Sequence, residues 1–148
     1  KITKEVREYL MDMADKLKIY RATADVDRFH YELTSDVSVE RPTRLVKQFK
    51  RLWISLKSLD DSYPDEKVKD IIQHLVDSSG NKIRQEIVSV LIKNKPFTIR
   101  DVQDILKKGR SVIKPQLEAL WNMGVLHKWV TLKQVGNKQE YVAEYILK

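Results

Sequence analysis

The amino-acid sequence predicts a mainly α-helical protein, in which an N-terminal helical bundle precedes a small domain of three helices and a β-hairpin. Two observations support this fold class. Apolar residues recur every three or four positions through most of residues 1–93, which is the period of an amphipathic helix. Near the C-terminus apolar and polar residues instead alternate on both sides of a turn-like Val135–Lys138, as in a hairpin. We therefore expect two domains, residues 1–80 and residues 81–148.

Three helices are expected in the first domain. Thr3 can cap the first helix. Pro42 and Pro64 suit the first turns of the second and third helices, where a missing N–H costs nothing. Residues 24–39 are mixed and polar, and indicate a short strand or an extended loop. The apolar residues expected in the core are Val6, Leu10, Met13 and Leu17, then Leu45, Phe49, Leu52, Trp53 and Leu56, and finally Val68, Ile71, Ile72, Leu75 and Val76.

The second domain is expected to begin with a helix over residues 82–93, which Pro96 ends. The next helix has the clearest local signal in the chain, because Thr98 can act as its N-cap while Asp101 stands at the third position of a capping box. Gly109 is expected to stop this helix and to supply the positive φ of the turn that follows.

The third helix of this domain contains a proline that limits where the helix can begin. Pro115 lacks an N–H and has a fixed φ, so we expect it in the first turn, with the helix starting near Lys114. Gly124 is the expected C-terminal breaker, after which the first strand of the hairpin begins. The side chains expected to face the core are Leu117, Leu120 and Trp121.

The run Ser111–Leu126 resembles the winged helix-turn-helix superfamily. It is similar to that family's recognition helix, in which two leucines three residues apart precede a glycine and two aliphatic residues. The resemblance implies a winged helix-turn-helix domain over residues 81–148, with the hairpin as its wing and the third helix in a DNA groove. Pro115 stands where many members carry a base-reading residue, which implies little sequence-specific readout. The resemblance places Ser111, Val112, Lys114 and Gln116 toward the groove, and Lys133 and Lys138 on the wing.

The charge balance favours a polyanionic partner. Lysines and arginines number 28 against 21 acidic residues, for a net charge of +7 and a pI near 9.5. This excess alone fits a merely basic surface equally well, but beside the winged-helix resemblance it favours duplex DNA bound through phosphates. Lys107, Lys108 and Arg110 gather before the third helix and join the candidate DNA-binding residues. A second basic group, Lys47, Lys50 and Arg51, is explained more simply as a solvated helix face.

The run Val37–Leu52 resembles the start of the lid helix in AAA+ ATPases, in particular minichromosome maintenance helicases and related archaeal or viral helicases. In those proteins an arginine opens a helix with an aliphatic stripe, and a turn, a further helix and a winged helix follow. The resemblance implies that residues 1–80 are lid-like and that Arg41 or Arg44 senses a nucleotide's terminal phosphate. The competing interpretation of either arginine is a surface ion pair. An ATPase domain would then precede this chain, which begins with Lys1 and is expected to be a fragment.

Several classes of activity lack their sequence signatures. No G-x-x-x-x-G-K-[ST] run is present to hold phosphates, no G-x-S-x-G elbow is present, and the chain has no cysteine. The three histidines are scattered without metal-ligand spacing. We therefore expect no catalytic residues, no metal and no cofactor in this chain. Because no apolar run of membrane-spanning length and no signal peptide is visible, we expect no membrane partner and an intracellular, nucleoid or nuclear location.

Three functions remain open from the sequence. The first is a DNA-binding accessory region of a replication helicase or similar ATPase. The second is a winged-helix transcription regulator that binds an operator as a dimer, because two-fold operators mirror the symmetry of the protein that reads them. The third is a winged helix that binds protein instead of nucleic acid.

Overall fold

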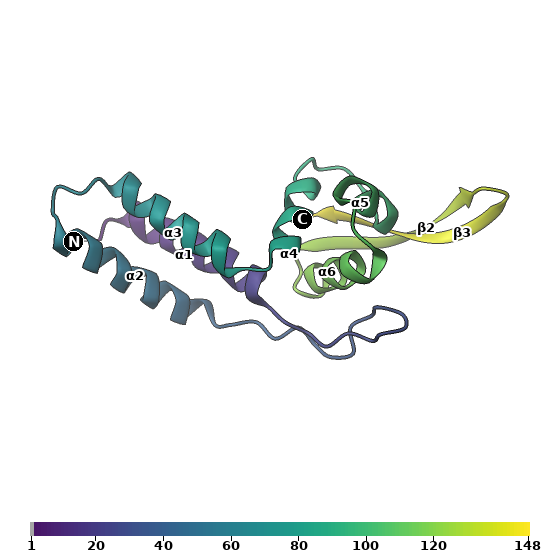
Figure 1. Ribbon diagram of the computed structural model, residues 1–148, viewed down its shortest axis with the longest axis horizontal. Helices are drawn as coiled ribbons and strands as arrows, with labels where there is room; N and C mark the ends of the chain where they lie inside the picture. Colours follow the sequence, from purple (N-terminus) through teal and green to yellow (C-terminus); the bar gives the residue numbers. More distant parts are fainter. Residues whose placement is uncertain (1) are drawn as a thin grey trace. The chain divides into compact units, whose positions relative to one another are not determined.

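The computed structural model describes residues 2–148 and is mainly helical with one small antiparallel sheet, which confirms the predicted class at this level (Figure 1). The chain divides into two compact units. One comprises the residues up to Ala22 together with Val39–Lys82, and the other comprises Thr23–Ser38 together with Ile83–Lys148. The elements in chain order are α1 (Lys4–Arg21), α2 (Pro42–Leu59), α3 (Asp65–Ser79), α4 (Lys82–Leu91), β1 (Phe97–Thr98), α5 (Ile99–Leu106), α6 (Arg110–Asn122), β2 (Leu126–Val135) and β3 (Lys138–Leu147).

The first unit is a bundle of α1, α2 and α3. Thr3 caps α1 as predicted, since its Oγ1 accepts a hydrogen bond from the N–H of Val6 at 3.3 Å. Pro42 is the first residue of α2, and Pro64 immediately precedes α3. Most of the expected apolar residues are buried, but Leu75 is 39% exposed. The prediction for Leu75 is wrong because the residues that do face the core, Val68, Ile72 and Val76, recur every four positions and leave Leu75 beside their stripe.

The second unit contains α4, α5, α6 and a three-stranded sheet in the order β1-β3-β2. Phe97 of β1 pairs with Tyr145 of β3, while β2 and β3 form a hairpin that runs from Leu126 opposite Leu147 to Val135 opposite Lys138. The hairpin turn lies where the sequence predicted it. Its two-residue loop starts at Gly136, whose φ of +62° is a conformation that glycine adopts without steric cost. The hairpin extends beyond the helices of its unit (Figure 1).

The segment Thr23–Ser38 lies in the second unit, although it precedes α2 in the chain. Its ends pair through two backbone hydrogen bonds between Thr23 and Ser38, and an isolated bridge joins Val26 to Leu33 farther along. The chain therefore leaves the first unit after α1 and returns to it before α2. The domain boundary predicted near residue 80 placed this segment with the helical bundle. The composition does not change at either end of the segment, and its place in the second unit depends on contacts with residues far along the chain.

The helix α5 is fixed at its start by the predicted capping box. The hydroxyl of Thr98 accepts the N–H of Asp101 at 3.1 Å, and the carboxylate of Asp101 accepts the N–H of Thr98 at 2.9 Å. The prediction for its end is wrong. Lys107, with φ 54° and ψ 43°, adopts the left-handed conformation, while Gly109 has φ −71° and is the N-cap of α6. The left-handed residue is therefore a lysine, which tolerates this conformation less well than glycine does.

The helix α6 begins at Arg110, earlier than predicted, and Pro115 lies inside it. Pro115 is buried, and its ring replaces an N–H that would otherwise donate to the carbonyl of Ser111 in the first turn. The end of α6 is as predicted. Gly124 has φ +78°, and the N–H groups of Gly124 and Val125 donate back to Trp121 and Leu120, which is the Schellman pattern.

The core-facing stripe of α6 differs from the prediction at one residue. Ile113, Leu117 and Leu120 are fully buried, but Trp121 is 44% exposed. Each step along an α-helix turns by about 100°, so the residue after Leu120 points away from the face that Leu117 and Leu120 share. The prediction that Trp121 faces the core is wrong.

A buried polar cluster joins α6 to the sheet. Glu118 is 8% exposed, and its Oε1 accepts hydrogen bonds from the hydroxyl of Tyr145 at 2.5 Å and from Nζ of Lys128 at 2.7 Å. Burial, and then the adjacent Glu118 carboxylate, raise the pKa of Tyr145 far above its ordinary value, so the phenol stays protonated and donates. The carboxylate is thus buried with one neutral donor and one cationic donor.

We expect Tyr145→Phe to destabilise the second unit by about 1.5–3 kcal/mol, because it removes a hydrogen bond to a buried charged group while keeping the ring. The measurement is urea unfolding followed by circular dichroism. Tyr141→Phe is the matched control, since Tyr141 is 80% exposed on the same strand and its hydroxyl should contribute almost nothing. Equal stabilities of the two variants would contradict the role given to the Glu118 cluster.

We expect Thr98→Ala to cost on the order of 1 kcal/mol, because it leaves the N–H of Asp101 without its capping partner. Thr98→Ser keeps the hydroxyl and should retain most of the stability, so the pair separates loss of the cap from loss of side-chain volume. Thermal unfolding of both variants measures the difference. A serine variant as unstable as the alanine variant would mean that packing of the methyl group, rather than the cap, supplies the stability.

Candidate nucleic-acid interface

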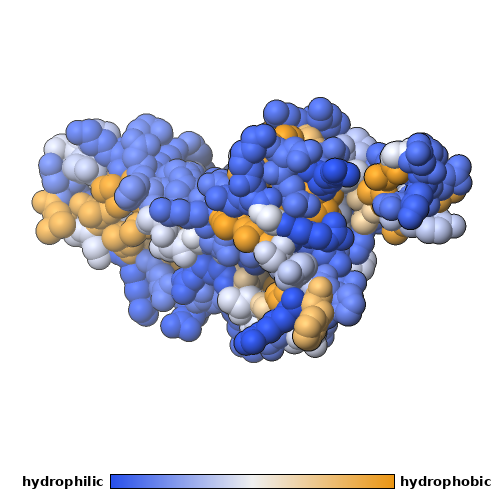
Figure 2. Space-filling view, turned by 45° about the vertical axis from the view of Figure 1, so that its right-hand side comes forward, coloured by the Kyte–Doolittle hydropathy of each residue, from blue (hydrophilic) through white to orange (hydrophobic). Residues whose placement is uncertain are grey.

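A cleft of about 1030 Å³ lies in the second unit between α6, the hairpin and the segment Thr23–Ser38. The helix contributes Arg110 and Trp121, the hairpin contributes Lys128 and Tyr141, and further lining comes from Glu32. The surrounding surface is mainly hydrophilic, with small apolar patches that include one on the hairpin (Figure 2). Cationic and aromatic side chains therefore share one concave surface, and acidic residues from Thr23–Ser38 stand beside them.

The sequence-predicted DNA-binding residues differ in how accessible they are. Five are exposed and could meet a ligand directly, whereas three are partly buried. The exposed residues are Lys107, Arg110, Ser111, Lys133 and Lys138, and the partly buried ones are Lys108, Lys114 and Gln116. The predicted cationic group at the start of α6 is thus exposed through Lys107 and Arg110, and the predicted cations of the hairpin are exposed as well.

Lys114 is held by the segment Thr23–Ser38 instead of projecting freely from α6. Its Nζ donates to the carbonyl oxygen of His30 at 2.8 Å and lies 3.4 Å from Oε1 of Glu32. As a result its side chain is only 13% exposed. The structure therefore differs from the expected groove-facing Lys114, because residues more than 80 positions earlier in the chain supply its partners.

Gln116 also differs from its expected position. Its Oε1 accepts a hydrogen bond from Nε of Arg84 on α4 at 3.0 Å. Arg84 is 4% exposed, and burial lowers the pKa of its guanidinium. The side-chain oxygen of Gln116 is therefore engaged inside the unit, between α6 and α4, and is not turned toward a ligand.

The hairpin cations lie in different surroundings. Lys133 forms an ion pair with Glu144, which is 8% exposed on the neighbouring strand. Lys138 stands directly after the turn and is exposed. Of the two predicted wing residues, Lys138 therefore has the charge more readily available to a polyanion.

The sequence interpretation missed part of this surface. Nζ of Lys128 lies 4.5 Å from the centroid of the Trp121 ring, a cation–π contact on the half-exposed side of α6. Arg100, at the second position of α5, lines the same cleft. The alternation of side chains along β2 could have placed Lys128 on the same face of the strand as Val130. No local sequence signal places Arg100 beside α6.

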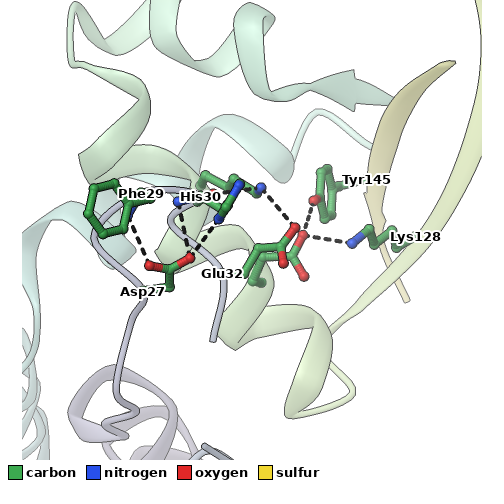
Figure 3. Close-up of polar contacts among 8 residues, drawn as sticks. Asp27, Phe29, His30, Glu32, Lys128 and Tyr145 are labelled. Carbon is green, nitrogen blue, oxygen red and sulfur yellow. Dashed lines mark hydrogen bonds and ion pairs between the residues drawn. The ribbon is translucent and has the colours of Figure 1, made fainter. Parts of the chain in front are cut away.

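The segment Thr23–Ser38 has a compact tip and lies along α6. The carboxylate of Asp27 accepts the N–H groups of Phe29 and His30 and contacts Nδ1 of His30 at 2.8 Å (Figure 3). These hydrogen bonds, led by the one from the backbone of Phe29, lower the pKa of Asp27. Closer to its end, the N–H of Val37 donates to Oδ1 of Asn122 at 3.5 Å. The segment therefore contacts α6 at Lys114, in the second turn, and at Asn122, the last residue of the helix.

The arginines that the lid resemblance singled out are at the start of α2 in the first unit. Arg41 is exposed and is the N-cap residue of α2, without a side-chain capping hydrogen bond. Nε of Arg44 lies 3.9 Å from Oε1 of Glu40, and Glu40 also pairs with Arg21 at 3.3 Å. Arg44 thus takes part in a surface ion pair, which was the competing interpretation.

Among residues 2–148, no group of three or more histidine, cysteine or acidic side chains is placed to hold a metal ion. No helix in the same range is both long enough and apolar enough to cross a bilayer.

Comparison with known proteins adds no relative. The chain matches no protein-family model, no curated protein and no solved structure. The function is therefore inferred from the residues of the second unit and their geometry.

Proposed function

We propose that the second unit is a winged helix-turn-helix domain that binds duplex DNA largely through phosphates, as the accessory region of a replication protein of the helicase-ATPase type. The observation that carries the proposal is the order of elements, α4-β1-α5-α6-β2-β3, combined with the sheet order β1-β3-β2. Three helices, a short strand after the first of them and a terminal hairpin make up the winged-helix arrangement, in which the third helix enters a DNA groove.

The exposed cations support phosphate binding. Lys107 and Arg110 flank the N-terminus of α6, and Lys138 stands at the tip of the hairpin. The N-terminus of α6 adds the partial positive charge of the helix dipole beside Arg110. Helix start and hairpin tip are the two places from which a winged helix reaches the backbone of one duplex, so these cations stand where phosphates would lie.

The state of α6 supports weak sequence specificity. Direct readout needs side chains that can donate to or accept from base edges in the major groove. Gln116 is engaged by Arg84, and Pro115 is buried within the helix. Arg110 and Ser111 are the exposed polar side chains of the first turn. With so few groups to read bases, phosphate contacts dominate the binding, and an operator-reading dimeric regulator is disfavoured.

The helicase-ATPase part of the proposal is supported by the first unit. Its three helices precede the winged helix in the order expected of a lid, and Arg41 stands exposed at the start of α2. The chain lacks a phosphate-binding Walker motif, so nucleotide hydrolysis would belong to another part of the protein. The isolated chain should therefore bind DNA without hydrolysing ATP.

We expect Arg110→Ala and Lys138→Ala each to weaken duplex binding and to flatten the slope of log affinity against log salt by about one unit, because each removes one counterion-releasing phosphate contact. The measurement is a salt titration by fluorescence anisotropy with two unrelated duplexes. Lys93→Ala is the matched control, since it removes one exposed charge from the same unit but does not line the cleft.

The outcomes of this titration separate the candidate functions. Similar losses on both duplexes support phosphate-dominated binding. A preference of roughly thousandfold for one duplex would instead favour the transcription regulator. No binding at low salt, by wild type or by variants with an altered Thr23–Ser38 segment, would overturn the DNA-binding proposal and favour a protein partner.

A further inference from the structure

The segment Thr23–Ser38, which we name the acidic arm, reverses the charge of the chain locally. Its charged residues are Asp25, Asp27, Glu32 and Asp36 against Arg28, whereas the whole chain has a net charge of +7. Glu32 and Asp36 line the same cleft as Arg100 and Arg110. An acidic segment therefore forms part of the wall of the cleft that Arg100 and Arg110 also line.

The arm lies along one face of α6. Lys114 contacts Glu32 and the carbonyl of His30, while Asn122 accepts the N–H of Val37. Lys114 and Asn122 are eight residues apart, so these contacts span about two turns, or about 12 Å, of the same helix face. Ile113, Leu117 and Leu120, which face the core, lie elsewhere on the helix. The arm therefore covers the outward face of α6, where the winged-helix arrangement places DNA.

The hydrogen bonds and ion pairs that join the arm to α6 are few, and they come from Lys114 and Asn122. Phe29 at its tip is 88% exposed and Val26 is 37% exposed, so these apolar side chains do not anchor it in the core. The side chain of Glu32 is 67% exposed, and ion pairs of this kind are weak and sensitive to salt. Tyr31, Leu33 and Val37 are partly buried, but no residue of the arm is fully buried, so the arm adds little to the core of the unit. The arm is thus placed to be displaced by a stronger polyanion.

We propose that the acidic arm is an autoinhibitory element, in which Glu32 and its neighbours occupy the place of DNA phosphates beside Lys114, so that DNA binds only after the arm leaves α6. The inference rests on the proposed DNA-binding function of the second unit. Only molecules with an open arm can bind, so the apparent affinity equals the intrinsic affinity multiplied by the open fraction. An arm that is closed in about nine molecules of ten therefore lowers the affinity about tenfold.

The first experiment removes the two arm charges that line the cleft, Glu32 and Asp36, without changing the shape of the arm, and the double variant is called arm-neutralised. Glu32→Gln/Asp36→Asn should raise the affinity for an unrelated duplex at low salt by about tenfold. Glu86→Gln/Asp104→Asn is the matched control, because both of these exposed acidic residues belong to the same unit but neither lines the cleft. Removing the same two charges there should raise the affinity by only about twofold, since screening limits the effect of distant charges.

A double-mutant cycle distinguishes release of the arm from a general effect of charge on DNA binding. In the wild type, Lys114→Ala removes both a DNA contact and an anchor of the arm, so the two effects partly cancel. In the arm-neutralised variant the anchor is already weakened, and Lys114→Ala should show the full loss of one phosphate contact. A larger loss in the neutralised background supports the proposal, whereas equal losses in both backgrounds contradict it.

The position of the arm can be followed directly because the chain contains no cysteine. A spin label on Phe29→Cys, at the exposed tip, should become more mobile when duplex DNA is added. A label on Ile92→Cys, which is 65% exposed in the same unit, should not change. An unchanged Phe29 label in a sample whose anisotropy shows bound DNA would overturn the proposal.

The failures of the two proposals are distinguishable. If wild type binds DNA and the arm-neutralised variant behaves like the Glu86/Asp104 control, the arm is not inhibitory and the DNA-binding proposal stands. If the arm-neutralised variant binds and the wild type does not, both proposals are supported. If neither binds at low salt, the DNA-binding proposal fails and the inference fails with it.

Discussion

The arrangement of the second unit depends on how the carboxylate of Glu118 is satisfied. A charged side chain at 8% exposure is costly to bury unless donors surround it, and here Tyr145 of β3 and Lys128 of β2 both donate to the same oxygen. These hydrogen bonds fix α6 against both strands of the hairpin. Apolar packing by Leu117 alone would tolerate small rotations of the helix, whereas the two donors select one orientation. That orientation decides that the face bearing Lys114 and Trp121 borders the cleft.

Features of the fold whose signals are complete within a few residues could be predicted from the sequence. Thr3 and Thr98 cap helices because their hydroxyls need only a backbone N–H three residues later. Gly124 ends α6, and Gly136 opens the hairpin loop, because both positions require a positive φ. The errors occurred where two local solutions compete. Either Lys107 or Gly109 could have taken the left-handed position, and in the structure Lys107 takes it.

The candidate site could be predicted only as a set of basic residues, since the partners of those residues come from distant parts of the chain. Gln116 is engaged by Arg84 from α4, and Lys114 by His30 and Glu32 from a segment that precedes α2. No periodicity or motif relates these positions. Trp121 illustrates the same limit at short range, because a tryptophan next to a buried leucine reads as apolar core until the helix orientation is known. Sequence patterns thus identified the helix but not which of its polar side chains are accessible.

The cost of releasing the acidic arm is limited by how the arm is built. Its neck is closed by backbone hydrogen bonds from Thr23 to Ser38 at 3.1 Å and from Ser38 to Thr23 at 2.7 Å, and its tip is closed by the turn at Asp27. Each hydrogen bond that joins the arm to α6, in contrast, involves a side chain of the helix, from Lys114 or Asn122. Breaking these contacts therefore leaves the hydrogen bonds within the arm intact, so it can leave α6 as one folded piece. In the proposed displacement a few polar contacts of Lys114 and Asn122 would be exchanged for phosphate contacts, without unravelling the arm.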